Sequence, residues 1–259
     1  MFPEERRKKI LDLIEKEGYV TINDITKTFK TSVVTVRRDL IELSNNGLIK
    51  KIYGGATKSE QIIKDSIFLK HKEEFQEEKK VIAAEAIKYI SDGDTVFIDS
   101  GTTCLELAKL LTQKKDLIVI TPGLHIINYL TEQSNNGNFD GQIFCTGGIW
   151  KKGTDVFWGS QKFGFFNEII INVAFFGIVA LSLVYGWMGI SLDDAEMVKK
   201  VVSISKKKIG LTVSKNFDKI SIAKIGDINI LDYIITDNKI NPDVLSAYRK
   251  ESTEILISK

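Results

Sequence analysis

From residue 68 to its last residue, the 259-residue chain alternates short apolar runs with segments whose apolar residues recur at helical spacing. The apolar runs expected to form strands are Thr95–Ile98, Leu117–Thr121, Gln142–Cys145, Asn172–Val179, Ile209–Val213, Tyr233–Thr236 and Ile255–Ser258. The segments expected to form helices are Phe68–Ser91, Leu105–Leu111, Leu124–Leu130, Asp193–Ile204 and Val244–Tyr248. This alternation of strands and helices predicts an α/β domain with a doubly wound, mostly parallel sheet.

The loop after the first expected strand has the composition of an anion site. It reads Asp99-Ser100-Gly101-Thr102-Thr103 and leads into the helical stretch Cys104–Leu111. Ligands of doubly wound sheets bind at the carboxyl ends of the strands. A glycine permits close approach of the backbone, and the N–H groups of a helix N-terminus, together with threonine hydroxyls, favour a phosphate group. The alternative is an ordinary capped turn between a strand and a helix.

The first 57 residues follow a different plan. Two amphipathic segments, Glu4–Glu17 and Thr21–Phe29, precede a third that begins after Ser32, a residue type that caps helix N-termini well. A glycine-punctuated segment, Gly47–Ala56, then reads as a β-hairpin. The residues of the third helix expected to face the core are Val33, Val36, Leu40 and Leu43. Three short helices and a hairpin predict a winged helix-turn-helix, whose third helix reads DNA.

The outward face of the third helix carries side chains suited to a DNA reader, because arginine can bond bidentately to guanine edges or clamp phosphates. Residues 1–58 contain 12 Lys and Arg against 8 Asp and Glu, and the remainder 24 against 26, so the basic surplus accompanies this helix. The alternative, a solvated pair of arginines on an ordinary helix, leaves the hairpin and the two preceding helices unexplained. The residues expected to contact DNA are Ser32, Val34, Thr35, Arg37 and Arg38 in the helix, and Lys50, Lys51 and Tyr53 in the hairpin.

Two motifs in this part of the chain carry a specific resemblance. Thr35–Leu40 reads Thr-Val-Arg-Arg-Asp-Leu, and Gly54–Ala56 reads Gly-Gly-Ala after the hairpin. With them the chain resembles DeoR-family bacterial transcription regulators, whose C-terminal sensor domain is related to sugar-phosphate isomerases. Further similar positions extend over almost the whole chain: Asp92–Asp94, Ser100–Thr103, Gly147–Gly148, Gly159, Ala174–Gly177, Glu196 with Lys199, Ser214–Lys215 and Ile235–Asp237.

The resemblance implies a sequence-specific DNA-binding regulator, a repressor of a sugar or carbohydrate-metabolism operon that responds to a phosphorylated metabolite. Its implied partners are double-stranded operator DNA, a phosphorylated sugar or related effector, and further copies of the chain in a homo-oligomer, a dimer or tetramer. In this scheme the 100–103 loop holds the phosphate, a lysine adds positive charge, and a carboxylate positions sugar hydroxyls. The residues implied to form the effector site are Asp99, Ser100, Gly101, Thr102, Thr103, Gly147, Gly148, Glu196 and Lys215.

The chain departs from the family pattern at three positions. Pro122 follows the second strand of the α/β part where many members have an asparagine, Asn172 stands for an aspartate, and Thr212 stands for another aspartate. Two carboxylates and an amide are thus absent from pocket-like positions. Because carboxylates commonly bind sugar hydroxyls, we expect weaker discrimination among sugars than in a fully matching family member.

The expected organisation is a winged helix-turn-helix domain at 1–57, a linker at 58–67 and an α/β effector-sensing domain at 68–259. Two cysteines without CxxC spacing and two histidines exclude a zinc cluster, so no metal or cofactor is expected. The N-terminus is charged from Glu4 onward and does not read as a signal peptide, which favours the cytoplasm. Cys104 is expected to pack beneath the 99–103 loop rather than react.

Two other functions remain open at this level. An isomerase fused to a DNA-binding domain needs a positioned general base, and neither His71 nor His125 stands in a promising place. A membrane-tethered regulator is suggested by Ile169–Leu192, which holds no charged residue and passes the ~18-residue test for a membrane span. Its glycines and Asn172 favour instead a buried central strand followed by a loop.

Overall fold

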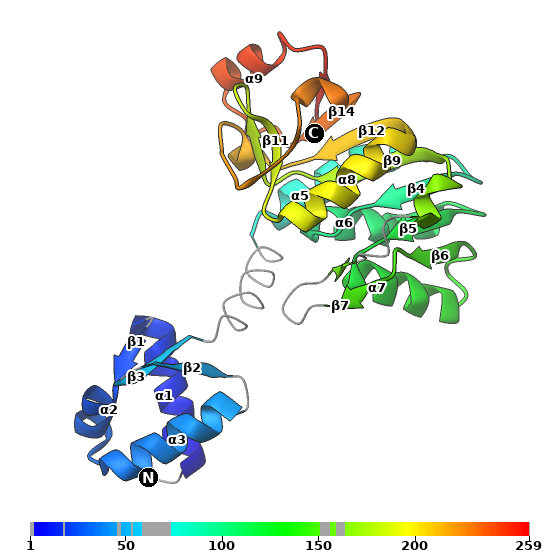
Figure 1. Cartoon of the computed structure of the whole chain (residues 1–259). Coiled ribbons are helices and arrows are strands. Elements are labelled where there is room, and N and C mark those ends of the chain that lie inside the picture. Colours follow the sequence, from blue (N-terminus) through cyan, green and yellow to red (C-terminus); the bar gives the residue numbers. More distant parts are fainter. Residues whose placement is uncertain are drawn as a thin grey trace. The chain divides into compact units, whose positions relative to one another are not determined.

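The computed structural model describes residues 3–17, 19–45, 48–52, 54–58, 74–150, 156–158 and 164–258. The chain divides into two compact units (Figure 1), an N-terminal one with the described residues up to Lys58 and a C-terminal one with those from Glu74 onward. The expected linker, 58–67, lies outside the described residues apart from Lys58. The limits of the two domains therefore stay a prediction.

The N-terminal unit is the expected winged helix-turn-helix. In chain order its elements are α1 (Pro3–Glu17), β1 (Tyr19–Thr21), α2 (Ile22–Phe29), α3 (Val33–Asn45), β2 (Ile49–Ile52) and β3 (Gly55–Lys58). Strands β2 and β3 form the expected hairpin, and β1, which the sequence pattern did not indicate, adds to β3 in an antiparallel sheet of order β1-β3-β2. Thr21 ends β1 and also caps α2, accepting a hydrogen bond from the Asp24 N–H at 3.0 Å.

The apolar stripe of α3 is largely as predicted. Val36, Leu40 and Leu43 are buried in a cluster with α1 residues such as Ile10. Val33 is a correction, because its side chain is 38 % exposed. It is the first residue of the helix, one turn before Val36, and the buried cluster contains no α3 residue that precedes Val36.

The C-terminal unit is built on one seven-stranded parallel sheet, which confirms the predicted α/β architecture. The sheet order is β15-β14-β12-β9-β4-β5-β6, and every neighbouring pair is parallel. The strand bounds are β4 (Thr95–Ile98), β5 (Ile118–Thr121), β6 (Gln142–Cys145), β9 (Ile171–Gly177), β12 (Ser205–Leu211), β14 (Tyr233–Thr236) and β15 (Glu254–Ile257). Successive strands run outward in one direction from β4 and in the other from β9, so the winding reverses between these two central strands.

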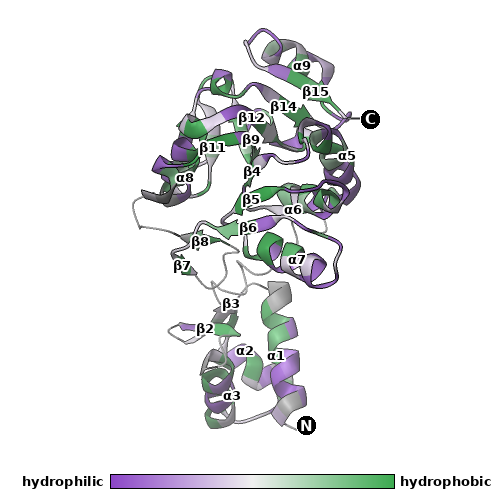
Figure 2. Ribbon diagram, turned by 90° about the vertical axis from the view of Figure 1, so that its right-hand side faces the viewer, coloured by the Kyte–Doolittle hydropathy of each residue, from purple (hydrophilic) through white to green (hydrophobic). Residues whose placement is uncertain are grey.

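Helices cover both faces of this sheet. One core cluster joins Val96 and Ile98 of β4 to α5 (Gln76–Ala86), α6 (Thr102–Leu110) and α7 (Leu124–Asn135). A second joins Phe97 to α8 (Leu192–Ile204) and α9 (Pro242–Tyr248). In Figure 2 the strands are largely hydrophobic and the hydrophilic colour gathers on the helices. Short 3₁₀ turns are η1 (Ile87–Tyr89), η2 (Leu111–Gln113), η3 (Gly164–Asn167), η4 (Ser214–Asn216) and η5 (Ile228–Ile230).

The uncharged stretch Ile169–Leu192 forms a buried strand, as predicted, and then a hairpin where a loop was expected. Its first part is β9 at the centre of the sheet, and its second part is β10 (Ala180–Ser182) and β11 (Gly186–Gly189). Strand β13 (Ala223–Gly226) completes a second sheet of order β10-β11-β13. Two further short strands, β7 (Ile149–Trp150) and β8 (Phe157–Trp158), pair with each other.

The prediction that residues 169–192 are all buried is wrong for the turn of this hairpin, and also for Ile170, Val179, Ile190 and Leu192, which are exposed. Val184 is 79 % exposed, and Leu183 and Tyr185 are exposed beside it, because the turn extends past the paired residues of β10 and β11. Gly186 ends the turn with φ +79°, and an added Cβ would lie 2.3 Å from the Gly226 carbonyl oxygen. Within the described residues we find no helix with the length and hydropathy that a membrane crossing requires.

The two halves of this stretch should differ sharply in their effect on stability. We expect Phe176→Ala, which empties a fully buried site in β9, to lower the free energy of unfolding by ~3–5 kcal/mol. Val184→Ala at the exposed turn should change it by no more than about 0.5 kcal/mol. Urea unfolding followed by the fluorescence of buried Trp187 measures both, and equal losses would contradict the strand assignment.

Candidate nucleic-acid interface and effector site

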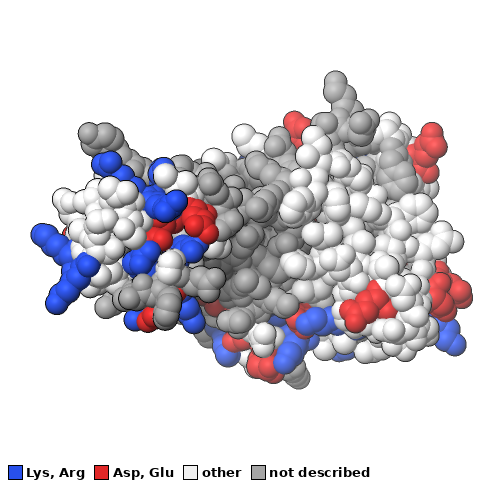
Figure 3. Space-filling model, turned by 90° about the horizontal axis from the view of Figure 1, so that it is seen from below, with Lys and Arg blue, Asp and Glu red and all other residues white. Residues whose placement is uncertain are grey.

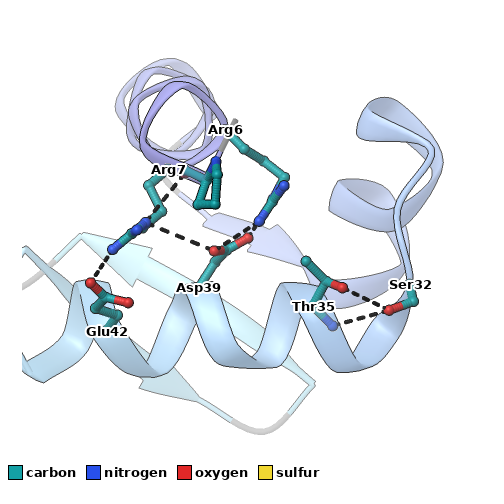
Figure 4. A network of polar contacts seen from close by, with 7 residues as sticks. Arg6, Arg7, Ser32, Thr35, Asp39 and Glu42 are labelled. Carbon is teal, nitrogen blue, oxygen red and sulfur yellow. Dashed lines mark hydrogen bonds and ion pairs between the residues drawn. The ribbon is translucent and has the colours of Figure 1, made fainter. Parts of the chain in front are cut away.

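The N-terminus of α3 is capped as predicted. The Ser32 hydroxyl accepts a hydrogen bond from the Thr35 N–H at 3.1 Å, and the two side-chain hydroxyl oxygens lie 2.8 Å apart (Figure 4). Ser32 and Thr35 therefore bond to each other at the end of the helix that a reader helix directs to the base edges. Their hydroxyls retain further hydrogen-bonding capacity for a phosphate or a base.

The outer face of α3 is open. Val34 is 76 % exposed, and Arg37, Arg38 and Ile41 are exposed with it. Figure 3 shows basic side chains standing out from the N-terminal unit, at the left of the view. An apolar methyl-bearing residue beside two guanidinium groups can contact thymine methyls and guanine edges in a major groove.

The hairpin contributes fewer described side chains than expected. Lys51 of β2 is exposed, opposite the buried Ala56 of β3. Lys50 lies in the same strand, but its side chain is outside the described residues, as is Tyr53 altogether. The proposed role of the hairpin therefore rests on Lys51.

Asp99 ties together the two strands between which the sheet reverses its winding. One carboxylate oxygen accepts the Ser100 N–H at 2.8 Å, and the other accepts the Gly177 N–H, at the end of β9, at 3.2 Å. Gly177 packs against the same loop, because an added Cβ would lie 3.3 Å from the Ser100 carbonyl oxygen. The predicted loop thus lies at the topological switch point, where open α/β sheets bind their ligands.

The loop presents a helix N-terminus to this point. Helix α6 begins at Thr102, two residues earlier than expected, so Thr102 and Thr103 belong to its first turn. Its N-cap is Gly101, with φ +124° and ψ 160°, a conformation that is strained for residues with a Cβ. A glycine cap supplies no side-chain acceptor to the first N–H groups of α6. They remain suited to an anion that approaches the helix end.

The electrostatics of the loop centre on Asp99. Burial, and after it the negative charge of Asp194, raise the pKa of Asp99 to about 7, although the hydrogen bonds from the Ser100 and Gly177 N–H groups act in the opposite direction. Near neutral pH this carboxyl group can therefore accept a hydrogen bond or, when protonated, donate one. Burial and the nearby Asp99 also raise the pKa of the Cys104 thiol, which is fully buried, so the predicted packing role of Cys104 is confirmed.

Sequence reasoning named Glu196 on α8, whereas the acid of this helix that acts on Asp99 is Asp194. Asp194 lies in the first turn of α8, where its N–H donates to the capping Ser191 hydroxyl at 3.4 Å. Glu196 is exposed and lies two positions further on, where a helix points side chains to another side. The signal for Asp194 was present in the sequence as an acidic residue three positions after a serine N-cap.

The other predicted effector residues are spread along the carboxyl edge of the sheet. Gly147 and Gly148 follow β6, and β5 separates that strand from β4. Gly147 and Gly148 have φ values of +75° and +108°. Lys215 lies in η4 after β12, the neighbour of β9, and its side chain is exposed. The structure thus brings Asp99–Thr103 together at one point and leaves Lys215 and the glycine pair on either side.

Of the three residues that depart from the family pattern, two do not line an open pocket at the carboxyl edge of the sheet. Asn172 is a correction, because it stands at the start of β9 and accepts the Thr95 N–H at 3.0 Å, at the amino edge of the sheet opposite the loop. Thr212 is buried, and its hydroxyl donates to the Ile178 carbonyl at 3.0 Å. Pro122 is buried beside Gly123, whose added Cβ would lie 3.4 Å from the Ser100 Cα.

Comparison with known families and proteins matches both units. Residues 6–61 match a DeoR-like helix-turn-helix domain, and residues 74–238 match a DeoR C-terminal sensor domain. The HTH-type transcriptional regulator GolR of Listeria innocua is 28 % identical over 100 % of both chains. The lactose phosphotransferase system repressor of Staphylococcus epidermidis is 29 % identical over 90 % of this chain and 92 % of its own.

Among solved structures, a D-ribose-5-phosphate isomerase in complex with phospho-erythronic acid aligns with 17 % identity and a TM-score of 0.40. The alignment covers 55 % of this chain and 54 % of that chain.

The pKa of Asp99 predicts a pH dependence of stability. Its value of about 7 lies above the ordinary 3.8, so between these values the folded protein binds more protons at this group than the unfolded chain does. The stabilisation is full below about pH 4 and is lost as pH rises towards 7. We expect the melting temperature of Asp99→Asn, relative to wild type, to rise from pH 5 to about pH 7 and to level off by pH 8. The exposed Asp116→Asn serves as control, and parallel profiles for wild type and Asp99→Asn would contradict the assignment.

Proposed function

The chain belongs to the DeoR family of transcription regulators, and we propose that it is a repressor of a sugar-metabolism operon whose operator affinity a phosphorylated metabolite controls. The chain is a DNA-binding regulator, since its two units match the family's helix-turn-helix and sensor domains. The relatives named above are a transcriptional regulator and a repressor of a sugar phosphotransferase system. They favour the regulator over the isomerase-like enzyme.

The exposed face of α3 is the observation that supports DNA recognition. Its arginines and Val34 extend from a helix that is capped at one end and buried along the opposite side. We infer that Arg37 and Arg38 reach base edges or the adjoining phosphates, and that Val34 contacts a thymine methyl. Lys51, with Lys50 and Tyr53 of the same hairpin, would contact the backbone beside the groove.

The glycine-capped N-terminus of α6 at the switch point supports an anionic effector. The N–H groups of its first turn and the hydroxyls of Ser100, Thr102 and Thr103 would hold a phosphate. Asp99 and Asp194 would face the hydroxyl-bearing end. Gly147, Gly148 and Lys215 would line the site only if the segments that carry them close over the ligand, and Glu196 only if α8 turns towards it.

Control of DNA binding requires the effector to have different affinities for two states of the protein. We infer a homo-oligomer, a dimer or tetramer, because each chain has one reader helix and helix-turn-helix proteins gain affinity from two half-sites. Binding of the phosphorylated ligand would then shift the population between an assembly that matches the half-site spacing and one that does not.

Substitutions on the N-terminal unit should separate base contacts from phosphate contacts. We expect Arg37→Ala or Arg38→Ala to cost ~1–3 kcal/mol in operator binding if that residue contacts a base. Lys51→Ala should weaken binding to all duplexes about equally and flatten its salt dependence. Mobility-shift titrations at several salt concentrations measure both effects, with Lys88→Ala on the C-terminal unit as control. Wild-type binding by an Arg37→Ala, Arg38→Ala double variant would refute the reader assignment.

The loop should recognise the phosphate group rather than the sugar alone. We expect a phosphorylated sugar or polyol to raise the melting temperature of the full chain by linkage, and the unphosphorylated compound to leave it unchanged. Thr102→Ala with Thr103→Ala should abolish the shift while operator binding persists. The exposed Thr131→Ala is the matched control. If no sugar phosphate shifts the wild type, or the double variant shifts equally, the loop is a structural turn.

A further inference from the structure

One of the two acidic residues of the reader helix, Asp39, is buried on the side away from the proposed DNA face. Asp39 directly follows Arg37 and Arg38 in the sequence, yet it is only 4 % exposed, whereas both arginines are exposed. Its carboxylate is held by Arg6 of α1, whose Nε donates to Oδ2 at 2.5 Å and whose Nη2 donates to Oδ1 at 3.2 Å (Figure 4). Two parallel hydrogen bonds of this kind fix orientation as well as distance.

A second arginine of α1 extends the contact along α3. Arg7 Nε lies 3.9 Å from Asp39 Oδ1, and Arg7 Nη1 forms an ion pair with Glu42, about one turn further along α3. The two arginines are consecutive, so a single turn of α1 holds two successive turns of α3. Figure 4 shows both arginines reaching from α1 to this one side of the reader helix.

Stability alone does not account for this arrangement. Burying an ion pair costs desolvation energy, and apolar residues of similar volume often stabilise a protein equally well or better. What an arginine–carboxylate fork adds is a defined rotation of one helix against the other. The same pairing also neutralises the carboxylate of Asp39, which directly follows the two arginines that we propose bind DNA.

We propose that Arg6 and Asp39 are positioning residues for DNA recognition, which set the rotation of α3 against α1 and so direct Val34, Arg37 and Arg38 at the base edges. The inference rests on the proposed DNA-binding role of α3. A rotated reader helix would keep its charge and its affinity for phosphates, but would lose its contacts to bases. The pair is therefore expected to determine sequence preference and to have little effect on non-specific affinity.

The test compares two DNA duplexes of equal length with the full chain. One is the duplex that the wild type enriches from a random-sequence pool, and the other is its shuffled sequence. Asp39→Asn should reduce the preference for the enriched duplex roughly tenfold and leave binding to the shuffled one unchanged or stronger. Glu42→Gln removes the same charge from the same helix without touching the Arg6 pair, and it should retain the wild-type preference.

Arg6 provides the second arm and guards against a variant that fails to fold. Arg6→Lys keeps the charge but cannot form the fork, so it should also lose preference. The Arg6→Lys, Asp39→Asn double variant should lose no more than the larger single loss, since both act through one contact. Binding is measured well below each melting temperature, so that all variants are folded.

Several results would overturn the proposal. A wild-type preference in folded Asp39→Asn or Arg6→Lys, whatever their melting temperatures, would reduce the pair to a stabilising contact. An equal loss of preference in Glu42→Gln would attribute the effect to charge alone. If the wild type enriches no sequence from the pool, the proposed DNA-reading function fails, and the positioning role fails with it.

Discussion

The proposed effector site depends on the point at which the parallel sheet reverses its winding. Because β5 and β6 follow from β4 on one side, and β12, β14 and β15 follow from β9 on the other, the chain leaves these two central strands towards opposite faces. The carboxyl ends of β4 and β9 thereby lie side by side. Asp99 bridges them through the Ser100 and Gly177 N–H groups, and glycines at 101 and 177 let the backbones approach. The geometry of the proposed anion site is thus a consequence of topology.

Both proposed sites must accept an anion next to an acidic residue, and the chain suppresses each negative charge by a different physical means. Asp39 beside the DNA-reading arginines is neutralised by pairing with Arg6. Asp99 in the phosphate loop has no such cation among its described contacts. Instead, burial and Asp194 bring its pKa to about 7, so the proton itself reduces the charge near neutrality. An aspartate with an ordinary pKa at position 99 would repel a phosphate dianion. The protonation of Asp99 therefore changes over the physiological pH range.

The spacing of apolar residues predicted most of the helices and strands, because each of these elements forms from residues that are close together in the sequence. Tyr233–Thr236 is a strand with the bounds that its apolar run indicated, and Ser32 caps α3 as its side chain allows. The predictions that failed concern residues whose surroundings depend on segments distant in the sequence. Val33 continues the helical stripe, but it is 38 % exposed, and the buried cluster contains no α3 residue before Val36. Asn172 was expected in the pocket at the carboxyl edge of the sheet. Because β9 begins at Ile171, Asn172 lies instead at the amino edge. Asp194 was missed because its proximity to Asp99 depends on how α8 returns to the sheet after the unpredicted hairpin.

The way in which α1 holds α3 also limits how an effector can act on DNA binding. A reader helix fixed by a two-point fork and a closed apolar core has one low-energy position. Allosteric control needs an element with two positions of similar energy, whose balance the ligand can shift by a few kcal/mol. The N-terminal unit, held in this way, is poorly suited to be that element. We therefore expect the effector to change how the N-terminal units of an oligomer are placed on the two half-sites of an operator. We do not expect it to change the internal structure of each N-terminal unit. Under that scheme a substitution that loosens Asp39 weakens sequence recognition in the presence and absence of effector alike, whereas one at the switch point changes only the response to effector.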